Sequence, residues 1–136
     1  MKLQPDKFDV QSIKGMGPGW IELVTEGQVE RIGHILIIGT RGERLPWHCP
    51  SFAALTAEHL AQLAELPAEV LLLGSGQRNR FVPAPWLRPL VQQNRGLETM
   101  DTAAACRTYN ILAGEGRRVI AALLLEAGAL APDRLK

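Results

Sequence analysis

Glu-Val-Leu-Leu-Leu-Gly-Ser-Gly, residues 69–76, is the stretch that decides the fold class. Four consecutive branched or large apolar residues stopped by a glycine are typical of a strand that is covered on both faces. We therefore predict a buried strand over Glu69–Gly74, and His34–Gly39 shows the same pattern. Helical patterns alternate with strand patterns after Ala53, which favours an α/β protein with a mostly parallel central sheet and helices on both faces.

The other elements follow from spacing, caps and chain-breaking residues. Leucines recur at helical spacing after Thr56, a plausible capping residue, and Pro67 closes that helix. The predicted helices are Thr56–Leu66, Pro85–Asn94 and Thr102–Ala113; the remaining predicted strands are Val10–Met16, Trp20–Val24, Leu97–Met100 and Arg118–Leu125, and residues 40–50 are predicted to form a surface loop. The two opening strands are expected to form a β extension at one edge of the sheet.

Length and composition exclude several classes of protein. The 136 residues suit a single domain, residues 1–136, and 46% apolar with 21% charged residues is a soluble, globular composition. A formal net charge of +1 gives no electrostatic argument for nucleic acid or an anionic membrane as partner. The sequence shows no secretory signal and no apolar run of roughly 20 residues. We therefore expect a cytoplasmic protein without membrane insertion.

A candidate binding crevice lies where two predicted strands end, because ligands of open α/β sheets bind at the carboxyl ends of strands. Its residues are Gly74, Ser75, Gly76 and Gln77 after one strand, Met100, Asp101 and Thr102 after another, and Arg80 on a loop that could close over them. The glycines can bring backbone amides close to an anion, and Ser75 adds a hydroxyl group. The pattern is neither a dinucleotide fingerprint nor a P-loop. A glycine turn and helix capping by Asp101 or Thr102 explain the same residues.

The two cysteines are too few for a disulfide scaffold and lack metal-ligand spacing. Cys106 is predicted to be a small buried residue, with a nucleophilic role as the alternative. A pairing of Cys49 with the adjacent His48 stays open. No acid/base pair of carboxylates stands out, so we expect no cofactor, no metal and a binding protein rather than an enzyme.

Polar residues near the end of the last predicted helix are interpreted as a structural cluster: Tyr109, Asn110, Glu115 and Arg117. The amide of Asn110 is expected to reach the turn that enters the final strand, and loss of either Asn110 or Arg117 is expected to lower the melting temperature. A basic surface is predicted from four arginines with no acid between them: Arg78, Arg80, Arg88 and Arg95. It suits either solvent or an acidic partner protein.

Residues 98–112 and 115–123, with their Met-Asp-Thr, Tyr-Asn and Glu-Gly-Arg combination, resemble the small family that contains mitochondrial complex I assembly factor 3. Leu71–Gly76 matches the strand and Gly-Thr-Gly of that family, with Ser75 in place of threonine, and Trp47 looks like the family's tryptophan. The resemblance covers essentially the whole chain. It implies a three-layer α/β/α domain with a mixed central sheet and an extra N-terminal β layer.

Two functions are therefore carried forward. The first is a non-catalytic interaction protein that is similar to an assembly factor of the respiratory NADH dehydrogenase, with another protein, such as a subunit of that complex, as its partner. The alternative is a small-ligand protein or enzyme that uses the crevice at Gly74–Gln77 and Met100–Thr102. A homodimer formed through an edge strand such as Trp20–Val24 also stays open.

Overall fold

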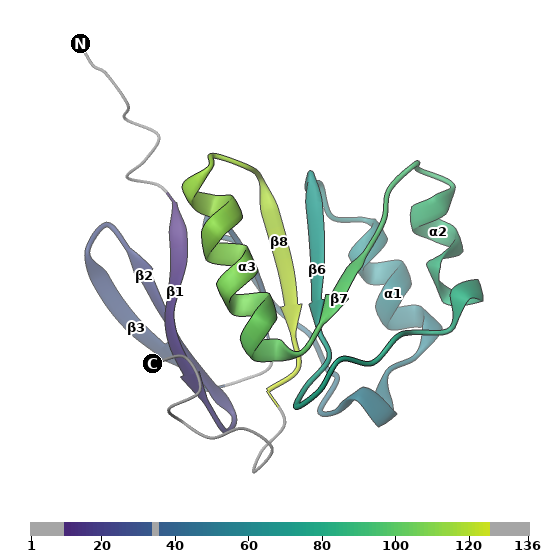
Figure 1. Cartoon of the computed structure of the whole chain (residues 1–136), viewed down its shortest axis with the longest axis horizontal. Coiled ribbons are helices and arrows are strands. Elements are labelled where there is room, and N and C mark those ends of the chain that lie inside the picture. Colours follow the sequence, from purple (N-terminus) through teal and green to yellow (C-terminus); the bar gives the residue numbers. More distant parts are fainter. Residues whose placement is uncertain (1–9, 34–35, 126–136) are drawn as a thin grey trace.

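The computed structural model describes residues 10–33 and 36–125, in which two β-sheets and three α-helices form a mixed α/β protein (Figure 1). The N-terminal sheet has the order β1-β2-β3 and is antiparallel throughout: β1 (Gln11–Gly17), β2 (Trp20–Thr25) and β3 (Gln28–Ile32). Strand β2 is thus central, and the expectation that it forms an edge is wrong. Strand β3 was not predicted because four of its five residues are exposed, so its sequence lacks the alternation of apolar and polar residues that indicates a strand.

The central sheet has the order β5-β4-β8-β6-β7: β5 (Arg44–Pro46), β4 (Leu36–Gly39), β8 (Val119–Leu123), β6 (Val70–Gly74) and β7 (Glu98–Met100). Strands β8, β6 and β7 are mutually parallel, whereas β4 is antiparallel to both β5 and β8. The sheet is therefore mixed, as predicted, but it is not mostly parallel. Residues 34 and 35 of the predicted strand His34–Gly39 lie outside the described residues.

Strand β5 explains this correction. It lies within residues 40–50, predicted to be a loop, and pairs with β4 from Ile38↔Arg44 to Leu36↔Pro46. The hairpin reverses the chain before the first helix, so β4 runs opposite to β6. Pro46 is tolerated here because β5 is an edge strand. Because proline is rare in strands, its presence in the sequence argued against a strand at this position.

The helices lie close to the predicted ones, with one difference. Helix α1 (Ala57–Ala64) is capped by Thr56, and α3 (Thr102–Gly114) is capped by Asp101. The predicted helix Pro85–Asn94 is instead a 3₁₀ helix, η3 (Ala84–Leu87), followed by the short α2 (Arg88–Val91). Pro89 has no N–H to donate to the carbonyl four residues before it, which prevents one continuous α-helix.

Two hydrophobic clusters lie on opposite faces of the central sheet, because successive residues of its buried strands alternate between them. Val119, Ala121 and Leu123 of β8 belong to the cluster that contains α3 and the N-terminal sheet; Ile120 and Ala122 belong to the one that contains α1 and α2. The α/β class is confirmed. The finer division into three layers with an added N-terminal layer stays a prediction.

Helix α3 is tied to β1 by two neighbouring polar side chains. The amide of Asn110 donates from Nδ2 to Ile13 O (2.7 Å) and accepts from Ile13 N (2.8 Å), and Tyr109 Oη donates to Gln11 O (2.7 Å). The amide therefore occupies the place that a paired strand would take beside Ile13. The expectation that Asn110 reaches the turn before β8 is wrong.

The predicted polar cluster is divided by this arrangement. Tyr109 and Asn110 face β1, whereas Glu115 and Arg117 are exposed beyond the end of α3. Arg117 Nε lies 3.4 Å from Glu69 Oε1, and the Arg118 N–H donates to the same carboxylate oxygen (2.8 Å), which lowers the pKa of Glu69. Arg117 thus joins a surface ion pair, not a buried contact.

Asn110→Ala is expected to lower the free energy of unfolding by about 1–3 kcal/mol, because it leaves both polar groups of Ile13 without their partner. Arg117→Ala, which removes an exposed ion pair, is expected to leave the free energy of unfolding unchanged within experimental error. Urea unfolding of the two variants beside the wild type measures the difference. Equal losses in both variants would contradict the division of the cluster.

Candidate functional site

The structure brings together the two halves of the predicted crevice at the carboxyl ends of β6 and β7. The Ser75 N–H donates to Met100 O (2.8 Å), and the Thr102 N–H donates to Gly76 O (2.9 Å). We call residues Gly74–Gln77, Arg80 and Met100–Thr102 the strand-end crevice. Backbone hydrogen bonds therefore join its two loops at the carboxyl ends of the strands.

The hydroxyl group of Ser75 is fully buried and serves the loop that follows it. Its Oγ accepts from the Arg80 N–H (3.0 Å) and can donate to Arg78 O (2.7 Å) or Met100 O (3.1 Å). The Arg80 guanidinium donates to Ser75 O and stacks over the ring of Phe52, 4.7 Å from its centroid. Both side chains therefore contact the chain itself, and the exposed residues of this loop are Gln77, Arg78 and Asn79.

Thr102 joins three segments through one buried oxygen. Its Oγ1 accepts from the Gly76 N–H (2.9 Å) and donates to Leu124 O (2.8 Å), just after β8. The contact needs glycine at position 74, since a Cβ there would lie 3.0 Å from the Cα of Thr102. The carboxylate of Asp101 accepts from the Ala104 N–H (2.8 Å), as an N-cap does.

These contacts decide what the strand-end crevice can do chemically. Loops of this kind bind anions elsewhere through backbone N–H groups that lack an acceptor in the chain. Here the N–H groups of Ser75, Gly76, Thr102 and Ala104 all donate to atoms of the protein. A binding role for the crevice stays a prediction, and the described geometry gives it no free donor among these four groups.

Both cysteines are buried, and the thiol of Cys106 is held protonated. Cys106 is buried, its Sγ lies 3.6 Å from Met16 Sδ, and burial raises its pKa to about 12, so the thiol stays protonated at neutral pH. Cys49 is also buried, and its Sγ lies 3.2 Å from Ser51 O. The ring of His59, the imidazole nearest in the sequence after His48, contacts the Thr56 N–H and His48 O instead.

Within residues 10–33 and 36–125 there is neither a cluster suited to a metal ion nor a helix suited to span a membrane. No three His, Cys, Asp or Glu side chains come together there in a way that could hold a metal ion. No helix in this part of the chain has both the length and the apolar character required to cross a lipid bilayer.

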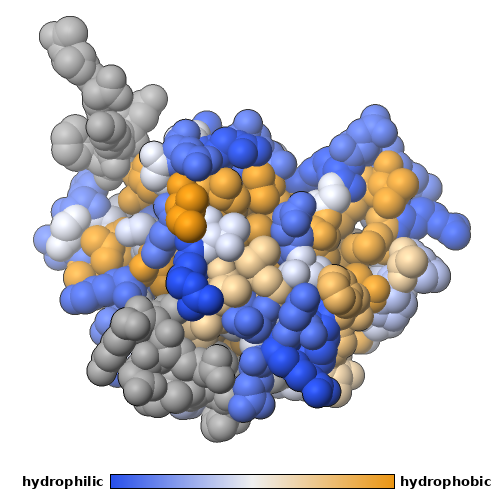
Figure 2. All heavy atoms as spheres, in the orientation of Figure 1, coloured by the Kyte–Doolittle hydropathy of each residue, from blue (hydrophilic) through white to orange (hydrophobic). Residues whose placement is uncertain are grey.

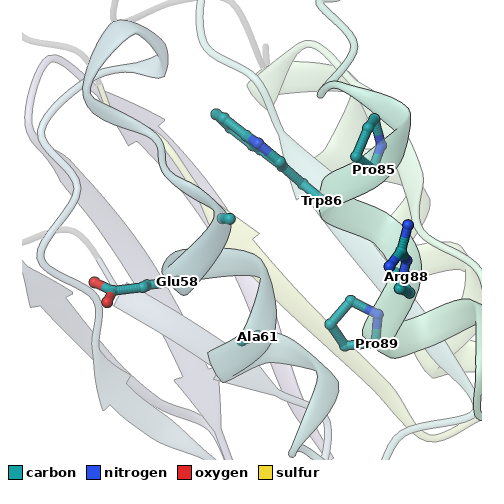
Figure 3. Close-up of a pocket in the computed structure, with 7 residues that line it drawn as sticks. Glu58, Ala61, Pro85, Trp86, Arg88 and Pro89 are labelled. Atoms are coloured by element: carbon teal, nitrogen blue, oxygen red, sulfur yellow. The ribbon is translucent and has the colours of Figure 1, made fainter.

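A groove that sequence reasoning missed lies between α1 and the η3–α2 segment (Figure 3). We call it the α1–α2 groove; its volume is about 470 Å³ and its lining residues are Ala57, Glu58, Ala61, Pro85, Trp86, Arg88 and Pro89. Figure 3 shows Trp86 and Pro89 on one wall, Ala61 on the other, and the carboxylate of Glu58 pointing away. Its only sequence signal is a tryptophan between prolines in a stretch without acids.

Apolar surface extends beyond this groove. In Figure 2 it interrupts the hydrophilic surface on the side of the molecule where α2 lies. The side chain of Val91, at the end of α2, is 64% exposed. Exposed apolar area of this kind is typical of binding surfaces.

The chain is similar to proteins of a known family and to named relatives. A family model described as a protein of unknown function, DUF498/DUF598, matches residues 13–124. A Danio rerio protein named NADH dehydrogenase [ubiquinone] 1 alpha subcomplex assembly factor 3 is 37% identical over 82 residues, which are 59% of this chain and 47% of the relative. An uncharacterized Rhodobacter capsulatus protein is 37% identical over 120 residues, 87% of each chain. The chain spans about half the length of the assembly factors that it matches.

The fold has a solved counterpart in a Bordetella pertussis protein described as an Mth938-like domain. Its solution structure matches with a TM-score of 0.70 and 32% sequence identity. The match covers 93% of this chain and 94% of that one. The mixed α/β architecture is therefore shared with a relative of similar length.

Thr102→Val is expected to destabilise the protein by about 2 kcal/mol, because it leaves the buried Gly76 N–H and Leu124 O without a partner. Thr108→Val, at a half-buried position of the same helix, is the matched control and is expected to change stability much less. Denaturant unfolding measures both. A Thr102→Val variant as stable as the control would show that the hydroxyl does not hold these segments together.

Alkaline pH is expected to destabilise the fold. The unfolded Cys106 thiol loses its proton near pH 9.0 but the folded one only near 12, so the unfolded chain binds fewer protons in this window. Stability from this group is complete below pH 9.0 and falls by about 1.4 kcal/mol per pH unit as pH rises toward 12. Burial also raises the pKa of Tyr109, so this residue adds to the loss of stability at alkaline pH.

Urea unfolding across this pH window tests the expectation, with Cys106→Ala as the variant that removes the thiol's contribution and leaves that of Tyr109. Iodoacetamide labelling of Cys106 at neutral pH gives a second readout. Labelling as fast in the folded protein as in urea would contradict a buried, protonated thiol.

Proposed function

Because the chain belongs to the DUF498/DUF598 family of proteins of unknown function, we propose its role from its named relatives and its surface. The proposed role is that of a non-catalytic interaction protein that helps to assemble a respiratory NADH dehydrogenase. In this proposal the partner is another protein, a subunit of that enzyme, and the setting is the cytoplasm of a bacterium.

The observation that carries the proposal is the similarity to assembly factors, at 37% identity over 82 residues of the Danio rerio protein. The structure adds support of a different kind. The polar atoms at the carboxyl ends of β6 and β7 bind one another, and the buried thiol of Cys106 is held protonated. Binding through the surface therefore has more support than the alternative of a small ligand or a reaction in the strand-end crevice.

The expected consequence of deleting the gene in its cell of origin is less assembled NADH dehydrogenase. Native electrophoresis of membranes, with in-gel staining for NADH oxidation, measures the assembled complex directly. Expression of the wild-type chain from a plasmid should restore the amount of complex, and a tagged wild-type chain should retrieve at least one of its subunits.

An unchanged amount of the complex in the deletion strain, together with no retrieved subunit, would contradict the proposal. The Asn110→Ala variant is the control for folding, because its loss of stability is expected to reduce function only in proportion to the loss of folded protein. If variants of Ser75 or Gln77 fold but do not restore the amount of complex, the result would instead favour a role for the strand-end crevice.

A further inference from the structure

The α1–α2 groove is concave, mostly apolar and bordered by arginine. Its lining is mostly small or ring-shaped: two alanines of α1, two prolines and the half-buried Trp86. Ala57 and Ala61 are one helical turn apart and exposed, so no long side chain of α1 covers the groove. A partner's side chain can therefore reach the ring of Trp86 and the ring of Pro89.

We propose that the α1–α2 groove docks an acidic peptide segment of a partner protein that carries one apolar anchor residue. The anchor lies between Ala61 and Pro89 against Trp86, and a flanking Asp or Glu meets the guanidinium of Arg88. This inference rests on the proposed interaction role and names the surface and the chemistry of the partner.

The η3–α2 wall of the groove is basic, which favours an acidic partner. Residues 70–97 contain four arginines and no acid. Arg78 and Arg88 are exposed, and neither forms an ion pair with a described residue. Arg95 donates to the carbonyl oxygens of Ala64 and Leu66 at the carboxyl end of α1, and its contacts there include no carboxylate.

The acid in the groove lining does not cancel this charge. Glu58 belongs to α1, and in Figure 3 its carboxylate points away from the groove, whereas Arg88 lies between Pro85 and Pro89 on the opposite wall. Complementary charge fixes the choice and register of a partner more than its affinity. An acidic residue beside the anchor is therefore the expected specificity element.

The residue types match those that dominate binding energy in protein interfaces. Tryptophan and arginine are enriched among residues whose loss costs most affinity, particularly where they surround an apolar pocket. A groove of about 470 Å³ has room for one or two side chains of a peptide. A net charge of +1 favours neither nucleic acid nor an anionic membrane over a protein segment.

The test uses a random peptide library displayed on phage and selected against the full chain. Enriched peptides are expected to place Asp or Glu next to Leu, Phe or Trp. Binding of the enriched peptide is then measured by fluorescence polarisation for Trp86→Ala and three further variants. Arg88→Glu reverses the groove's charge, Ala61→Glu fills the groove, and Arg107→Glu reverses an exposed arginine on α3 as the matched control.

Arg88→Glu and Ala61→Glu are each expected to weaken binding about tenfold or more, while Arg107→Glu leaves it unchanged. Trp86→Ala is expected to abolish binding, but Trp86 also packs against the core, so its effect counts only if the melting temperature is kept. Ala61 is exposed on a helix and glutamate is a good helix former, so Ala61→Glu is expected to fold although Glu58 and Glu65 add like-charge neighbours. Its melting temperature is measured beside its binding, which separates binding from folding.

Absence of enrichment, a basic or uncharged consensus, or binding that Ala61→Glu leaves intact would overturn the proposal. So would flotation with anionic vesicles that is lost in the Ala61→Glu variant, which would assign the groove to a membrane. In the cell, an unchanged amount of the complex in the deletion strain together with no retrieved NADH dehydrogenase subunit defeats the proposed function. Equal retrieval by the wild type and Ala61→Glu defeats only the groove.

Discussion

The close approach of β6 to the first turn of α3 is the contact on which the rest of the structure depends. Glycine at position 74 permits it, because any side chain there would meet the backbone of Thr102 at 3.0 Å. One hydroxyl group then satisfies the Gly76 N–H and the Leu124 carbonyl together, in a place that water does not reach. The ends of β6 and β8 and the start of α3 are thereby fixed relative to one another, and the two hydrophobic clusters form on either face of that frame.

This junction also uses polar groups that a ligand could otherwise contact. In many α/β proteins the same strand ends keep unpaired N–H groups for a ligand. Here the chain supplies the acceptors itself, from Met100 O and Gly76 O to Asp101 Oδ1. The α1–α2 groove lies on the other side of the central sheet, among side chains that the junction does not use. The proposed interaction through that groove therefore leaves the hydrogen bonds of the junction intact.

The sequence predicted the elements whose burial leaves an unambiguous pattern. Uninterrupted apolar runs identified β6, β8 and the described part of β4, and caps or breakers identified α1 and α3. Strands β3 and β5 were missed because each is an edge strand with exposed residues, and the missed reversal at β5 gave the wrong direction to β4. Asn110 shows another limit: its position in a helix indicates that its amide needs a partner, but Ile13 lies 97 residues away. The α1–α2 groove could not be predicted from the sequence, because its concave shape depends on Ala57 and Ala61 of α1 lying opposite the η3–α2 segment.

The edges of the N-terminal sheet bear on how a partner can bind. At β1, the amide of Asn110 occupies both polar groups of Ile13, so no incoming strand can pair with that residue. At β3, Glu30 forms an ion pair with Arg44, and Arg31 pairs with Glu22 and stacks over Trp20. Charged, engaged side chains on an edge oppose strand addition, since pairing would disturb them. Both edges of the N-terminal sheet therefore argue against strand addition there, whereas the docking proposed for the α1–α2 groove relies on side chains and needs no free strand edge.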